Sequence, residues 1–61
     1  SDIETEIQLI QLDIRSLREE LFRAESIECP SLRNVITNLL TVLIRRANEK
    51  LQQLQERLGT N

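Results

Sequence analysis

The 61-residue sequence contains no histidine, methionine, tryptophan or tyrosine, and only one each of glycine, proline, cysteine and phenylalanine. A single cysteine cannot form an intrachain disulfide. Without histidine, the chain has neither the His/Cys clusters of zinc sites nor the Ser-His or Cys-His pairs of nucleophilic catalysis. One glycine near the C-terminus cannot build a glycine-rich phosphate loop. We therefore expect no enzymatic activity, no metal and no cofactor.

Turn-forming and aromatic residues are too few for a β-sandwich or β-barrel, which leaves one small all-α domain over residues 1–61. The longest apolar run, residues 39–44, is interrupted by Thr41 and falls far short of the ~20 residues that span a membrane. The chain shows no signal-peptide pattern. A lone cysteine suits a reducing environment, so we expect an intracellular location in an unspecified compartment.

The two halves of the chain carry opposite charge within a net charge of −2. Residues 1–28 hold eight acids and three arginines, whereas residues 31–61 hold five bases and two acids. Such halves favour each other as neighbours. A nucleic-acid site needs a concentrated basic patch and aromatic rings for base stacking, whereas here the bases are spread out and Phe22 is the one aromatic residue. We therefore do not expect nucleic-acid binding.

The N-terminal part of the chain has the heptad spacing of an amphipathic helix. Its apolar residues recur at alternating steps of four and three, with a mean period of 3.5, as in coiled coils. Ser1 and Glu4 have the spacing of a capping box. The pattern predicts a helix from about residue 2 to about 26. The predicted core stripe consists of Ile3, Ile7, Ile10, Ile14, Leu17, Leu21 and Ala24.

Pro30 interrupts this helical pattern. Proline disfavours helical geometry in the residue before it, here Cys29, and suits the first position of a new helix. We predict a turn over about residues 27–30 that joins two antiparallel helices. The alternative is one long helix kinked at Pro30, which costs about 3 kcal/mol.

The second predicted helix runs from about residue 30 to about 58, with Gly59 at the position of a C-terminal cap. Its main stripe has a period of 3.6 over residues 36–54. A heptad stripe in the same register would place Arg46 and Lys50 in the core. The stripe predicted to face the first helix consists of Leu32, Ile36, Leu39, Leu43, Ala47, Leu51, Leu54 and Leu58.

Many apolar residues lie outside these two stripes. Between residues 35 and 44 the apolar arc is about 200° wide, against the ~100° of an ordinary surface helix. Two helices form one seam without a closed core, so a chain this short needs burial from elsewhere. We predict a two-fold dimer of hairpins, a four-helix bundle, with a tetramer left open. The predicted oligomer interface consists of Leu9, Leu12, Val35, Ile36, Leu39, Leu40, Val42, Leu43 and Ile44.

In such a dimer the second hairpin is reversed end to end, and Leu9 and Leu12 meet the partner's second helix over residues 35–42. The architecture resembles the Rop-type dimer of helical hairpins. We interpret the chain as the homo-oligomerisation domain of a larger regulatory, scaffold or viral protein, consistent with its start at Ser1 in place of methionine. Two alternatives stay open, an adaptor that binds amphipathic helices of a different protein and a small helical nucleic-acid-binding regulator.

Other polar residues have ordinary explanations. Cys29 is expected to be incidental or structural, because no histidine is available to activate it. Thr41 is expected to hydrogen-bond within its own helix. Arg45 and Arg46 are expected to pair with acids of the first helix, Asp13 among them. Three carboxylates are expected on a solvated face and not in an acid–base or metal site: Glu19, Glu20 and Glu25.

Overall fold

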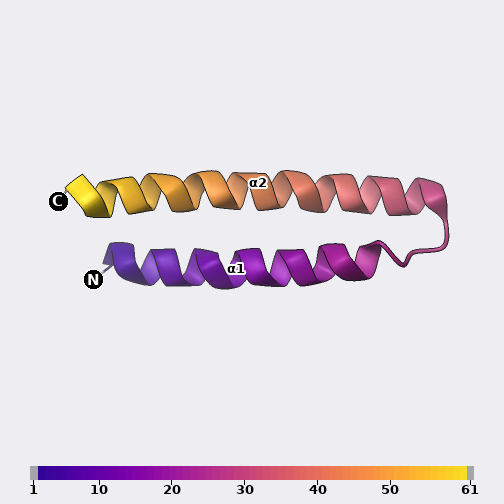
Figure 1. Ribbon diagram of the computed structural model, residues 1–61, viewed down its shortest axis with the longest axis horizontal. Helices are drawn as coiled ribbons and strands as arrows, with labels where there is room; N and C mark the ends of the chain where they lie inside the picture. Colours follow the sequence, from indigo (N-terminus) through magenta and orange to yellow (C-terminus); the bar gives the residue numbers. More distant parts are fainter. Residues whose placement is uncertain (1, 61) are drawn as a thin grey trace.

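The computed structural model describes residues 2–60, which form an antiparallel pair of helices (Figure 1). Helix α1 spans Asp2–Ala24 and helix α2 spans Pro30–Thr60. The two helices lie side by side along their length and are joined at one end by a short connector. This confirms the all-helical hairpin and rules out the single helix kinked at Pro30. The predicted cap at Ser1 lies outside the described residues.

Helix α1 packs on α2 with the face that its heptad spacing predicts. Ile14 and Ala24 are buried, and the other five members of the predicted stripe are half-buried. Asp2 and Glu4 lie in the first turn, where carboxylates favour the positive end of the helix dipole. The stripe predicted for the first helix is therefore confirmed.

The connector begins with a tightened last turn of α1. The backbone N–H of Ser26 donates to the Arg23 carbonyl (3.1 Å), and that of Ile27 donates to the Ala24 carbonyl (3.1 Å). These bonds span three residues in place of four, which is a common way to satisfy the last carbonyls of a helix. Helix α1 consequently ends at Ala24, two residues before the predicted end.

Helix α2 begins where the proline predicts. The Cys29 carbonyl accepts the first helical hydrogen bond, from the N–H of Arg33 (2.8 Å), and Pro30 occupies the first helical position, where its missing N–H costs nothing. The Arg33 guanidinium also donates to the Ile27 carbonyl (2.9 Å). This bond ties the first turn of α2 back to the connector.

The face of α2 that packs on α1 agrees with the predicted stripe only in part. Four members of the stripe are buried or half-buried: Ile36, Ala47, Leu51 and Leu54. Four members of that stripe are exposed: Leu32, Leu39, Leu43 and Leu58. The face that does pack follows a heptad in another register, with every member buried or half-buried: Arg33, Thr37, Leu40, Ile44, Ala47, Leu51 and Leu54.

Two residues of the packed face, Arg33 and Thr37, are polar, so this register is not evident from the sequence. Thr37 satisfies its hydroxyl by donating to the Asn34 carbonyl (3.3 Å), and Arg33 satisfies its guanidinium on Ile27. Each side chain thus has a hydrogen-bond partner at the seam, and no buried side-chain nitrogen or oxygen of the described residues lacks one. Because the packed face is this heptad, α2 needs neither Arg46 nor Lys50 in the seam.

Gly59 does not cap α2. The helix continues through Thr60, and no described glycine has a positive φ. A glycine cap is commonly accompanied by an apolar contact from the residues that follow it. The residue after Gly59 is the polar Thr60, so the sequence does not supply an apolar residue at that position.

The hairpin is one helix thick and has no closed core. Its backbone measures 48 × 14 × 11 Å. Only Ile14, Ala24 and Leu54 among the described residues are buried, and none of them has less than 2% of its surface exposed. The seam between the helices is thus the one apolar contact that the described chain makes with itself.

A candidate protein-interaction surface

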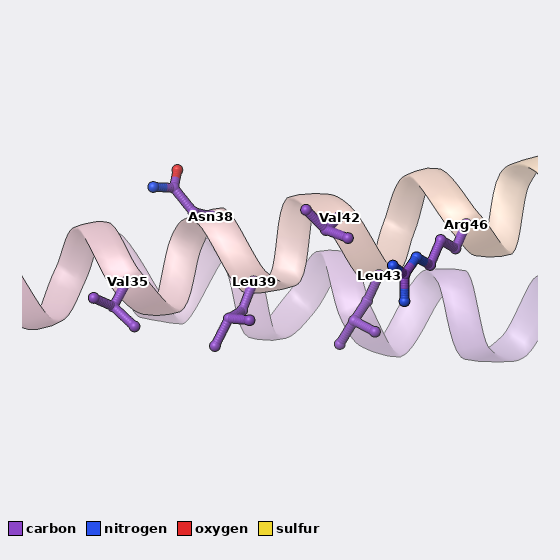
Figure 2. A pocket seen from close by; sticks show the side chains of 6 residues that line it. All are labelled: Val35, Asn38, Leu39, Val42, Leu43 and Arg46. Carbon is purple, nitrogen blue, oxygen red and sulfur yellow. The ribbon is translucent and has the colours of Figure 1, made fainter.

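The most prominent surface feature is an apolar patch on the turn half of α2. We define the apolar patch as Leu32, Val35, Leu39, Val42 and Leu43, all of which are exposed, with Leu39 at 59%. An open groove of about 500 Å³ runs along it, bordered by Asn38 and Arg46. Figure 2 shows Val35, Leu39 and Leu43 projecting to the same side of the helix, with Arg46 beside Leu43.

The patch lies in a part of the chain without charge. Residues 34–44 contain no ionisable side chain. Beyond Leu43 the same face of α2 becomes basic, because Lys50 and Arg57 follow Leu43 at steps of seven and Arg46 follows Leu39 at the same step. We call Arg46, Lys50 and Arg57 the basic end of α2.

The neighbouring face of α1 is acidic. A second open groove of about 330 Å³ is lined by Asp13, Ser16 and Leu17 from α1 and by Leu43 and Ala47 from α2. Asp13 therefore lies on the same side of the hairpin as the apolar patch. Carboxylates recur along this side of α1 at steps of four, seven and seven, and we call them the acidic row: Asp2, Glu6, Asp13 and Glu20.

The predicted interface residues fall into two groups. Six of them are exposed: Leu9, Leu12, Val35, Leu39, Val42 and Leu43. The other three, Ile36, Leu40 and Ile44, are half-buried in the seam with α1. The apolar arc of α2 is therefore shared between two uses. One edge packs on α1 and the other edge is open.

Leu32 belongs to the open surface, although it was predicted to lie in the stripe that faces the first helix. The signal was present: Leu32, Val35, Leu39 and Val42 follow steps of three, four and three. Besides Leu9 and Leu12, two further large apolar residues are exposed outside the patch, Phe22 (76% exposed) and Leu58.

The polar residues considered in the sequence occupy ordinary positions. The Thr41 hydroxyl donates to the Thr37 carbonyl (2.8 Å), which confirms its bond within α2. Cys29 is a free, exposed cysteine. Glu20 forms an exposed ion pair with Arg23, and Glu19 and Glu25 are exposed.

Arg45 and Arg46 do not form the ion pairs predicted for them. Within residues 2–60 no salt bridge joins either arginine to Asp13 or to another acid of α1. The physical reason is the register of α2, which points Ile44 toward α1 and leaves Arg46 at the border of the outer groove.

Over the same residues, His, Cys, Asp and Glu side chains form no group of three that could hold a metal ion. Neither described helix is both long and apolar enough to span a membrane. Comparison of the chain with protein-family models, with curated proteins and with solved structures gave no match. Function must therefore be inferred from the surfaces of the chain.

Proposed function

We propose that this chain is a non-enzymatic self-association module, the homo-oligomerisation domain of a larger regulatory, scaffold or viral protein, with a dimer as the favoured assembly. The observation that carries the proposal is the apolar patch of α2. Large aliphatic side chains that gather on one face of a helix indicate a surface covered by another chain. Dispersed exposed apolar residues such as Phe22 need no such explanation.

The exposed area supports the same proposal. The chain exposes 4850 Å², whereas a compact folded protein of 7.1 kDa exposes about 4,100 Å². The difference of about 750 Å² is close to the ~800 Å² that each partner buries in a standard interface. A second copy that covered the patch would bring the hairpin to the exposure of an ordinary small domain.

The charge layout favours self-association over nucleic-acid binding. The basic end of α2 lies on the same side of the hairpin as the acidic row of α1, because Asp13 and Leu43 border one groove. A phosphate backbone that approached Lys50 would also meet these carboxylates, which weakens the attraction. A second copy supplies both signs of charge and can match them.

The proposal is tested by mass. Light scattering of the purified 7.1 kDa chain over a range of concentrations should give twice that mass at high concentration and a shift toward the single chain on dilution. Leu43→Asp should abolish the dimer, because a carboxylate buried in an apolar interface is costly. The matched control Glu19→Ala should leave the mass unchanged, since Glu19 is exposed and lies outside the acidic row. A single-chain mass for the parent at every concentration would contradict the proposal and favour an adaptor that binds a helix of a different protein.

A further inference from the structure

The apolar patch occupies only the turn half of α2, and this limits how a second copy can align with it. Helix α2 runs from Pro30 to Thr60, whereas the patch extends from Leu32 to Leu43. A two-fold axis perpendicular to two paired helices brings residues together at equal distances on either side of itself. Apolar side chains meet apolar side chains only when this axis lies near the middle of the patch, where Leu39 is the nearest patch residue.

This alignment gives the self-association proposed above a direction and a register. We propose that two copies pack α2 against α2 in antiparallel orientation, with the two-fold axis beside Leu39. Leu39 then lies against the partner's Leu39, and Val35 lies level with the partner's Leu43. The centre of the contact is made by residues 34–44, which carry no charge, so no ionised group has to be desolvated there.

The charges that flank the patch fit this register. Arg46 is seven residues from Leu39, or about 10 Å along the helix. It therefore lies level with the partner's Leu32, at the start of the partner's α2 and next to its connector. That connector carries Glu25 and Glu28, which are exposed in the hairpin. The guanidinium of Arg46 thus approaches an acidic segment while its aliphatic stem lies along apolar side chains.

A parallel α2–α2 pair fits the charges poorly. In that arrangement each residue faces its own counterpart, so Arg46, Lys50 and Arg57 would each lie beside a like charge. Like charges placed opposite one another in an interface oppose association.

An antiparallel pair with full overlap is also disfavoured. Its axis would lie beside Arg45, the midpoint of α2. Lys50 would then lie level with the partner's Leu40, beside the patch, and Arg57 would lie level with the partner's Arg33. The fully overlapped pair would thus replace contacts between apolar residues of the patch with contacts to Lys50 and Arg57. The staggered pair centred on Leu39 is therefore favoured.

The stagger changes the expected position of Leu9 and Leu12. Asp13 and Leu17 border one groove with Leu43 and Ala47. Because the two helices are antiparallel, this places Asp13 about level with Ala47, and Leu9 and Leu12 about level with residues 48–51 of α2. With a two-fold axis beside Leu39, residues at this level lie opposite the partner's connector and the first turn of its α2. These two leucines are thus placed near the partner's turn. The sequence had instead predicted that they contact residues 35–42 of the partner's second helix.

The native cysteine permits a direct test. Cys29 is free and exposed, and it is the only cysteine in the chain. A nitroxide on Cys29 lies ten residues from Leu39, so the two labels of the proposed dimer are separated by about 30 Å along the helices. A parallel pair would give about 10 Å, the distance between adjacent helix axes. The fully overlapped pair would give about 48 Å. Electron paramagnetic resonance distinguishes these three distances.

A second label position makes the test independent of any single distance. In the variant Cys29→Ser/Gln52→Cys, the label lies on the other side of the proposed axis, at an exposed site. The separation should rise to about 39 Å in the proposed dimer, whereas it should fall to about 21 Å in the fully overlapped pair. Light scattering should confirm that each labelled chain keeps the mass of the unlabelled one.

The outcomes separate this inference from the proposed function. A dimer mass with separations of about 30 Å and 39 Å supports the seam beside Leu39. A dimer mass with either of the other patterns overturns the seam but leaves self-association standing. A single-chain mass with no dipolar coupling between labels overturns both.

Discussion

Leu39 and Leu40 are adjacent in the sequence but lie in different environments, because Leu40 is half-buried against α1 whereas Leu39 is 59% exposed on the outer face of α2. Consecutive residues of a helix are rotated by about 100°. That rotation is enough to carry a side chain from the seam to the apolar patch. One leucine therefore contributes to the hairpin, and the next is available to a partner.

This pair offers a matched test of the two uses of α2. Leu40→Ala should destabilise the hairpin by about 2 kcal/mol, because it removes aliphatic contact from the seam. Leu39→Ala should leave the hairpin itself nearly unchanged and raise the dimer dissociation constant by roughly tenfold or more. Sedimentation equilibrium gives the dissociation constant, and circular dichroism at low concentration gives the helicity of the single chain. Equal effects of both substitutions on both measurements would contradict this division.

Thermal unfolding should depend on protein concentration. If folding is stabilised by association, the midpoint rises with concentration through mass action. For a chain of this size we expect a rise of about 5 °C for a tenfold increase in concentration. Circular dichroism melts over a hundredfold range measure it. A midpoint that stays constant, together with a single-chain mass, would show that the hairpin is stable alone.

Arg33 should contribute to the turn. Its guanidinium donates to the Ile27 carbonyl at 2.9 Å in a partly buried position, so Arg33→Ala should lower the free energy of unfolding by about 1–2 kcal/mol. Arg45→Ala is the control, because Arg45 is exposed and should contribute less than about 0.5 kcal/mol. Urea denaturation of both variants at one concentration provides the comparison. Indistinguishable midpoints would mean that the connector does not need this bond.

Leu9 and Leu12 should matter to association and not to the hairpin. Both are more than half exposed, at 56% and 54%, on the side of α1 away from the seam. Leu9→Ala/Leu12→Ala should weaken the dimer by about 1 kcal/mol or more, as expected for apolar groups covered by a partner. Phe22→Ala is the control, because Phe22 is more exposed still and its position in the helical repeat places it on the opposite flank of α1 from Leu9. A dissociation constant unchanged by the leucine substitutions would remove them from the interface.

Helix α1 and the turn could be predicted from the sequence because each is determined by one clear feature, the apolar heptad for α1 and Pro30 for the turn. The seven stripe residues of α1 are all aliphatic and all fit one heptad, so a single face is possible. Pro30 excludes a continuous helix and suits the first position of α2, where the structure places it. The N-terminus of α2 follows from that one residue.

The face of α2 could not be chosen from periodicity alone. Its apolar arc is about twice as wide as one neighbour covers, so both edges of the arc present a regular stripe. The predicted stripe followed the edge that is richer in leucine. The edge that packs on α1 includes the polar residues Arg33 and Thr37. Those two fit the seam only because their polar atoms bond to Ile27 and Asn34, and such local bonds are not visible in the sequence. The width of the arc did predict that part of it stays exposed, because one neighbouring helix cannot cover both of its edges.

The 11 Å thickness of the hairpin has a consequence for hydrogen exchange. No backbone amide of a layer one helix thick is far from solvent, so none is shielded by a surrounding core. In the isolated chain, amide protons should exchange whenever a helix opens locally, with little difference between positions. Slow exchange confined to residues 34–44 would therefore map the surface that a second copy covers.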